Sequence, residues 1–170
     1  GFRTVHVLRG VEEIEAASIV RTRLFSDLRH EHGPFDVIGD VHGCLGELLG
    51  LLGLLGYAVE HDAGGRPVDA MHPAGRRVVF VGDLVDRGPD SPGVVRLVMG
   101  MVTAGHAFAV PGNHENKLVR ALSGRKVTVS HGLETTLAQL DAEPAAFREA
   151  VRVWCDGLVS HLVLDDGRLV

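Results

Sequence analysis

The stretch RRVVFVGDLVDRGPDS (residues 76–91) leads from an apolar run through a glycine–aspartate pair into a polar loop. The same pattern occurs earlier in FDVIGDVHGC (residues 35–44) and later in HAFAVPGNHE (residues 106–115). Each apolar run has the length of one strand, and a run with helical character follows each polar loop. Three strand–loop–helix units in succession predict an α/β fold with at least one partly parallel sheet.

The other elements are predicted from the same kinds of signal. Helices are expected over Cys44–Leu55, Ser91–Ala104, Glu115–Leu122, Thr135–Leu140 and Ala145–Asp156. Residues 62–75 are rich in glycine and proline and are expected to form a loop. An Asp-Gly pair at residues 166–167 predicts a final hairpin. Residues 1–33 are expected to be a leader or linker from a preceding module, with a short strand at 5–8 and a helix at 11–20.

The composition is that of an ordinary globular protein and excludes several classes. The 170 residues are 45% hydrophobic and 23% charged, which argues against intrinsic disorder. A formal net charge of −5 provides no global basic field for nucleic acid, although an enzyme that handles only a strand end needs few phosphate contacts. No apolar run approaches the roughly 20 residues needed to cross a bilayer. Cys44 and Cys155 show no metal or disulfide spacing, so we expect two reduced thiols in a cytoplasmic protein.

Oxygen donors and imidazoles gather where the three predicted strands end. A glycine precedes Asp40, Asp83 and Asn113, and His42 lies two residues after Asp40. Each of these alone is commonly a cap or turn residue, but the ordered set favours a metal site of hard ligands. Because strand ends meet at one edge of such a sheet, we expect Asp40 and His42 to bind one ion, Asp83 to bridge two, and Asn113 to bind the second. Two ions about 3.5–4 Å apart can hold a hydroxide and a phosphate between them. We expect two divalent ions, Mn first, with Ni, Fe or Zn as alternatives.

Three further residues are predicted to act on the substrate. Arg87, in the glycine- and proline-rich loop after Asp83, is expected to bind phosphate, although it could instead pair with a neighbouring aspartate. His114 follows Asn113 directly, so its side chain should point away from the metal and suits a general acid. Asp86 is expected to hold the His114 imidazole, or to be only a turn residue.

Two other histidines are weaker candidates for the further ligands that a two-metal site needs. His131 lies in VSHGLETT and His161 in VSHLVLDDG. His161 is expected to open a strand, and its side chain could face either way.

The GDVHG, GDLVDRG and GNHE blocks, in that order, resemble the calcineurin-like metallophosphoesterase superfamily from residue 35 to about residue 122. The resemblance implies a β-sandwich flanked by helices and the ligand and catalytic roles given above. Longer stretches, such as PGNHENKLVRALSGRKVTVSHGLETTLAQL (residues 111–140), resemble the phosphatase domain of bacterial polynucleotide kinase-phosphatase. That resemblance implies removal of a 2′- or 3′-phosphate, or of a 2′,3′-cyclic phosphate, from RNA 3′ ends during RNA repair. It also implies flanking kinase and ligase-like modules and an RNA 2′-O-methyltransferase as a repair partner.

The resemblance also predicts that the sequence is a segment of a longer protein. Residues 34–170 are expected to be the N-terminal part of a metallophosphoesterase domain that is C-terminally truncated, since two metal-binding histidines of the superfamily should fall beyond Val170. Four of six ligand positions would then be present. The segment alone is therefore expected to bind metal weakly and to have little phosphatase activity.

Two other functions remain open from the sequence. A serine/threonine protein phosphatase or a dinucleoside polyphosphate hydrolase shares the three blocks, although protein phosphatases resemble a pattern with arginine where Pro111 precedes Gly112. A non-catalytic docking segment of a repair complex is the alternative of a different class.

Overall fold

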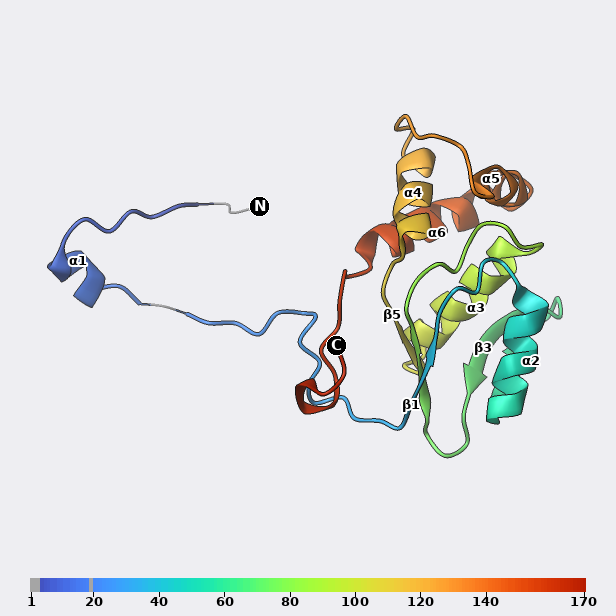
Figure 1. The fold of residues 1–170 in the computed structure, drawn as a ribbon, viewed down its shortest axis with the longest axis horizontal. Coiled ribbons are helices and arrows are strands. Elements are labelled where there is room, and N and C mark those ends of the chain that lie inside the picture. Colours follow the sequence, from blue (N-terminus) through green and yellow to red (C-terminus); the bar gives the residue numbers. More distant parts are fainter. Residues whose placement is uncertain (1–3, 19) are drawn as a thin grey trace.

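The computed structural model describes residues 4–18 and 20–170, and its central feature is a parallel sheet in the order β1–β4–β5. The strands are β1 (Phe35–Ile38), β4 (Arg77–Phe80) and β5 (Ala107–Ala109). The register pairs Ile38 with Phe80 and Phe80 with Ala109. The three strands therefore end level with one another, so the loops that follow them leave the same edge of the sheet (Figure 1). The predicted α/β class is confirmed.

Five helices begin and end within two residues of the predictions. They are α2 (Leu45–Leu55), α3 (Ser91–Thr103), α4 (Asn113–Leu122), α5 (Leu133–Asp141) and α6 (Ala145–Gly157). The start of α3 is fixed by Asp90, whose carboxylate accepts a hydrogen bond from the Gly93 amide at 2.8 Å. Proline at the first turn adds to this signal because its missing amide is not needed there.

The core lies between α3 and the sheet. The apolar face of α3 contributes Val94, Leu97 and Met101, all with no exposed surface, and these pack in one cluster with Val78 and Phe80 of β4. In Figure 1, α2 lies beside the sheet, and α4, α5 and α6 lie together above it in the view. The central strand and its helix are thus anchored by burial of apolar area, which holds the loop after β4 in place.

A β-hairpin occupies part of the stretch that was expected to be a loop. Strands β2 (Ala58–His61) and β3 (Pro67–Met71) pair antiparallel, so the prediction of a continuous loop is wrong there. The strand β3 is held by tertiary contact with α3, since a Cβ on Gly100 would lie 1.6 Å from the Val68 carbonyl oxygen. The contact between β3 and α3 therefore determines the structure of residues 67–71, and the composition of those residues does not reveal it.

The leader and the last residues also differ from the predictions. Helix α1 covers only Val11–Glu15, and residues 5–8 form no strand; residue 19, in the predicted helix, lies outside the described residues. The final hairpin is reduced to one bridge between Leu164 and Leu169 around a short 3-10 helix at Asp165–Gly167. Among the described residues, no helix is long and apolar enough to cross a bilayer.

Candidate metal centre

The loops after β1 and β4 are bonded to each other through their backbones. The amide of His42 donates to the Asp83 carbonyl at 2.9 Å, and the amide of Gly43 donates to the Leu84 carbonyl at 2.8 Å. These bonds bring together the two stretches that carry Asp40, His42 and Asp83. The predicted convergence of the strand ends is therefore present in the fold.

The backbone of these loops is strained at the residues that carry the polar side chains. Asp40, His42 and Asp83 have φ values of 53°, 48° and 54°, in the left-handed region that side-chain-bearing residues avoid. Such residues cost on the order of 1–3 kcal/mol each and gather at functional sites. In the first loop the positive φ lies at Asp40 itself, and not at the preceding Gly39.

Two glycines are needed for a different reason, the close approach of β4 and β5 at their ends. A Cβ on Gly82 would lie 2.3 Å from the Gly112 nitrogen, and a Cβ on Gly112 would lie 2.1 Å from an Asp83 carboxylate oxygen. Only glycine fits at both places. The absence of side chains there lets the Asp83 carboxylate lie beside the start of α4.

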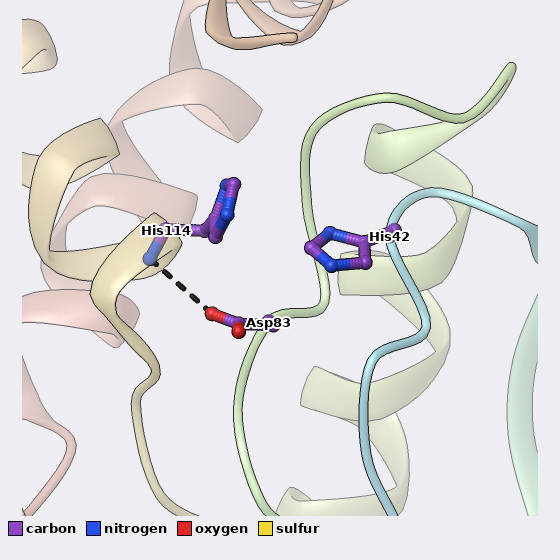
Figure 2. A group of neighbouring side chains, drawn as sticks. All are labelled: His42, Asp83 and His114. Atoms are coloured by element: carbon purple, nitrogen blue, oxygen red, sulfur yellow. Dashed lines mark hydrogen bonds between the residues drawn. The ribbon is translucent and has the colours of Figure 1, made fainter. Parts of the chain in front are cut away.

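His42, Asp83 and His114 form a group that could hold a metal ion (Figure 2). The His114 ring thus lies toward the other two side chains, and not away from them as its position directly after Asn113 suggested. One ligand atom from each of the three lies within 4.8 Å of the others. His42 and His114 are buried, their rings 4.8 Å apart edge to face, and Asp83 is half-buried. Imidazole nitrogen and carboxylate oxygen are suitable ligands for Mn, Fe, Zn and Ni.

The surroundings of His42 show how a cation fits this group. Its Nδ1 lies 3.0 Å from the Val85 carbonyl oxygen, which can only accept, so Nδ1 carries the proton and donates. The Nε2 lone pair then lies 3.4 Å from Asp40 Oδ1, another acceptor, on a side chain that is 83% exposed. Two acceptor atoms this close repel each other unless a cation binds between them. A backbone carbonyl that fixes the tautomer of a histidine is also typical of metal sites. The donor set therefore fits a divalent cation.

The His114 ring is held in place by Asp86. The Nδ1 of His114 lies 2.7 Å from Asp86 Oδ2, and both side chains are buried. Asp86 is in turn fixed through its backbone amide, which donates to Thr136 Oγ1 at 3.0 Å and to Ser91 Oγ at 3.2 Å. Since Nδ1 is engaged, Nε2 is the nitrogen that remains for a metal ion or a substrate. The other carboxylate oxygen of Asp86 has no hydrogen-bond partner in the described part of the chain.

Arg87 and Asn113 lie at the rim of the site. Arg87 is exposed, has a φ of 68°, and makes no ion pair within 4.0 Å with any residue that the structure describes. The alternative in which it pairs with a neighbouring aspartate is not seen. Asn113 is exposed and is the first residue of α4, directly before His114.

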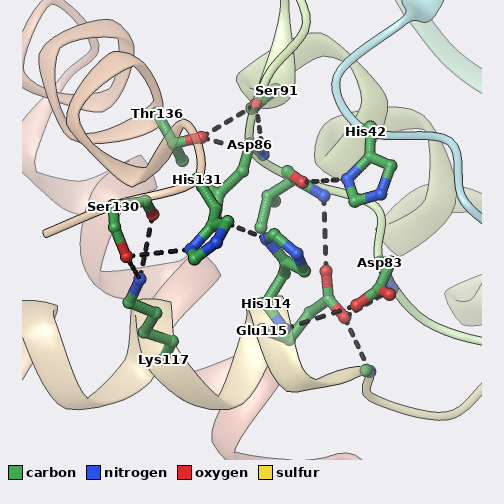
Figure 3. Close-up of polar contacts among 12 residues, drawn as sticks. His42, Asp83, Asp86, Ser91, His114, Glu115, Lys117, Ser130, His131 and Thr136 are labelled. Atoms are coloured by element: carbon green, nitrogen blue, oxygen red, sulfur yellow. Dashed lines mark hydrogen bonds and ion pairs between the residues drawn. The ribbon is translucent and has the colours of Figure 1, made fainter. Parts of the chain in front are cut away.

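Glu115 is the residue whose importance the sequence did not reveal (Figure 3). Its carboxylate has no exposed surface and accepts from four backbone amides, those of Asp83 and Leu84 at 2.8 Å, Gly112 at 2.7 Å and Val85 at 3.3 Å. Three of these amides belong to the loop after β4 that carries Asp83, and Gly112 belongs to the loop after β5. One side chain thus clamps two of the three strand ends. The only signal for it was its position three residues after Gly112, where a helix-capping glutamate is favoured.

A second set of contacts from α5 fixes the loop between Asp86 and α3. Gln139 accepts from the Ser91 amide at 2.9 Å and donates to the carbonyls of Gly88 at 3.1 Å and Pro89 at 2.8 Å. Thr136 lies 3.1 Å from Ser91 through the two hydroxyls. These residues are remote in sequence from the three blocks, so only the tertiary structure shows what they do.

The two weaker histidine candidates do not join the metal-binding group. His131 is exposed, and its Nδ1 lies 2.9 Å from Ser130 Oγ. His161 is also exposed and lies outside any strand, so the prediction that it opens one is wrong. In the part of the chain that the structure describes, the group contains neither of them.

Comparisons with known proteins place the chain among phosphoesterases. The family model for calcineurin-like phosphoesterases matches residues 33–161. The bis(5′-nucleosyl)-tetraphosphatase PrpE (asymmetrical) of Halalkalibacterium halodurans is 56% identical over 108 residues, which are 64% of this chain and 42% of that protein. The protein of the same name from Geobacillus thermodenitrificans is 45% identical over 139 residues, which are 79% of this chain and 54% of that protein. The chain thus spans about half the length of these curated relatives. A crystal structure of a candidate diadenosine tetraphosphatase aligns at 30% identity with a TM-score of 0.49, over 78% of this chain and 46% of that one.

These relatives correct the expected substrate and partners. Their name describes a hydrolase of dinucleoside tetraphosphates, so the expectation of an RNA end-healing phosphatase is wrong. The predictions of RNA 3′ ends as substrate, and of kinase modules, ligase-like modules and an RNA methyltransferase as partners, are wrong for the same reason. The physical reason is that the three blocks build the metal centre, which serves any phosphoryl group, and do not determine what is attached to the phosphate.

The match of the family model covers most of the chain, and the residues at the three strand ends form the group described above. The chain belongs to the calcineurin-like phosphoesterase family.

Proposed function

We propose that the protein hydrolyses dinucleoside polyphosphates, splitting a phosphoanhydride bond at a centre of two divalent metal ions. The observation that supports this most strongly is the 45% identity, over 79% of the chain, with a bis(5′-nucleosyl)-tetraphosphatase. The fit of His42, Asp83 and His114 to a cation supports the metal-dependent chemistry. Mn is the ion that we propose first.

Four residues would hold the metal ions: Asp40, His42, Asp83 and Asn113. When bound, the ions supply positive charge that stabilises the phosphoryl oxygens and activates the attacking water. Arg87, exposed and free of ion pairs in the described chain, would bind a phosphate oxygen with its planar set of donors. Its position in a strained loop against Gly132 limits its freedom, because a Cβ on that glycine would lie 2.3 Å from the Arg87 nitrogen.

His114 would act as the general acid. Water attacks phosphorus and gives up a proton to the solvent, the anhydride P–O bond breaks, and the leaving phosphate oxygen keeps the bonding electrons. The Nε2 of His114 would donate a proton to that oxygen, while Asp86 at 2.7 Å stabilises the imidazolium before transfer. The leaving phosphate depends only weakly on protonation by a general acid, since its pKa is about 6 and it is stable as an anion at neutral pH.

This assignment predicts a dependence on the leaving group. In His114→Asn, the kcat for phenyl phosphate should fall about 10²–10⁴-fold, because phenolate (pKa about 10) needs the proton. The kcat for p-nitrophenyl phosphate, whose leaving group is far less basic, should fall much less. Steady-state kinetics with both esters measure this. Equal losses for the two esters, together with weaker Mn binding, would show that His114 is a metal ligand instead.

The proposed function is tested with diadenosine tetraphosphate, Mn and the full-length protein, with the products separated by anion-exchange chromatography. We expect metal-dependent turnover that is lost on chelation. Rapid release of phosphate from phosphopeptides or 3′-phosphorylated oligoribonucleotides, without cleavage of the dinucleotide, would overturn the proposal.

A further inference from the structure

A basic pocket lies beside the metal-binding group, on the side of α4. It has a volume of about 480 Å³, and its polar lining residues are Asn113, Asn116, Lys117, Arg120, Lys126 and Thr128, with Val127 beside them. Three of these side chains are cations and none is a carboxylate. We refer to this cavity as the basic pocket.

The three cations are not neutralised by the protein. Within residues 4–18 and 20–170, no carboxylate oxygen lies within 4.0 Å of Lys117, Arg120 or Lys126. Lys117 instead donates to the Ser130 carbonyl at 2.9 Å and hydroxyl at 3.0 Å, which ties the loop after α4 to the helix (Figure 3). The nearby Glu115 is fully buried and bound to backbone amides. Unpaired cations gathered around one cavity attract an anion of several charges.

The basic pocket is linked to the candidate metal centre through Asn113. Asn113 lines the pocket and directly precedes His114, whose ring belongs to the metal-binding group. A leaving group that departs on the Asn113 side of the centre would move toward the basic pocket. The predicted proton donor and two of the three cations, Lys117 and Arg120, are thus carried by the same helix, α4.

The opposite side of the centre has a different character. Strands β1 and β5 flank β4, so the pocket beside Asp40 lies across the sheet from the basic pocket. It has a volume of about 300 Å³ and is lined mainly by apolar residues, with Asp40 and Glu47 as its only charged groups. Phosphates are attracted to the β5 side and repelled from the β1 side.

From this asymmetry we infer that the basic pocket binds the phosphates of the substrate that lie beyond the reacting one. The inference rests on the proposed function and adds to it the residues that would recognise the polyphosphate. With one terminal phosphate of a tetraphosphate at the centre, the other three extend toward Lys117, Arg120 and Lys126. Cleavage then releases a nucleoside monophosphate, and the nucleoside triphosphate leaves through the basic pocket.

The test uses Arg120→Ala/Lys126→Ala in the full-length, Mn-loaded protein. Both side chains are exposed, so their removal should leave folding intact, whereas Lys117 also supports a loop and is left in place. Arg125→Ala is the matched control, since Arg125 is an exposed cation of the same loop that does not line the pocket. The readouts are the KM for diadenosine tetraphosphate, the inhibition constant of inorganic tripolyphosphate, and the kcat/KM for p-nitrophenyl phosphate.

For the double variant we expect the KM and the inhibition constant to rise about tenfold or more, since a lost charge-assisted contact is commonly worth a factor of ten. The effect on p-nitrophenyl phosphate, which has a single phosphate, should be several times smaller, and Arg125→Ala should resemble the wild type. Equal effects on all substrates, or no effect on tripolyphosphate, would overturn the inference. If the wild type fails to cleave the dinucleotide but tripolyphosphate still inhibits it through Arg120 and Lys126, the proposed function fails while the basic pocket stands.

Discussion

Asp83→Asn is expected to abolish Mn-dependent hydrolysis, with a loss of at least about 10³-fold in kcat, because the substitution removes the negative charge from the middle of the metal-binding group. The Asp83 carboxylate supplies a ligand atom that lies within 4.8 Å of one from His42 and one from His114. Asparagine keeps the shape of the side chain and an oxygen that can accept from the His114 amide, as Asp83 does at 3.3 Å. The fold should therefore survive, and the change in activity should report on the metal.

Isothermal titration with Mn and steady-state kinetics measure the two consequences separately. Asp156→Asn is the matched control, since it removes one exposed carboxylate from α6, away from the three strand ends. Its Mn titration and its kcat should equal those of the wild type. A titration of Asp83→Asn that could be superimposed on that of the wild type would mean that the ions bind elsewhere.

Glu115→Gln is expected to destabilise the protein by about 3–5 kcal/mol and to weaken the metal site at the same time. The wild-type carboxylate satisfies four backbone amides with two oxygens, and no water is at hand to replace it because the side chain is fully buried. Glutamine turns one acceptor into an NH₂ group that faces amide donors, and buried amides left without a partner cost about 1–3 kcal/mol each. The ends of β4 and β5 would then separate and carry Asp83 away from His114.

Thermal unfolding measures this effect, and a loss of that size should lower Tm by roughly 10 °C for a chain of this length. Glu134→Gln in the first turn of α5 provides the comparison, because Glu134 is exposed and makes no ion pair among the residues described. It should shift Tm by no more than a degree or two. A Tm for Glu115→Gln close to that of Glu134→Gln would show that the carboxylate does not hold the two loops together.

The parallel sheet could be predicted because its signals are local and repeat. Each strand is a short apolar run that ends at a glycine, and the next helix starts at a recognisable boundary such as Asp90 before Ser91. The hairpin of β2 and β3 could not be predicted in this way. Its second strand contains Pro67 and Asp69, which disfavour strands, and is held by the close approach of Val68 to Gly100.

In the candidate metal centre, too, some residues could be predicted from local sequence signals and others could not. The residues at the strand ends, such as Asp40 and Asp83, could be named in advance because parallel strands deliver their ends to one edge. The residues that hold the loops in place, such as Glu115 and Gln139, act through hydrogen bonds to backbone groups distant in sequence, which no sequence pattern records. The substrate could not be derived from the blocks either, because the groups that we infer to bind the rest of the substrate, such as Lys126 of the basic pocket, lie outside them.

The central claim is that three strand ends share divalent metal ions. Anomalous diffraction at the Mn edge from crystals of the Mn-loaded, full-length protein tests it most directly. We expect strong peaks within bonding distance of Asp40, His42, Asp83 and Asn113, with the Asp83 carboxylate between two of them. Peaks confined to other parts of the molecule, with none at the Asp83 carboxylate, would contradict the account.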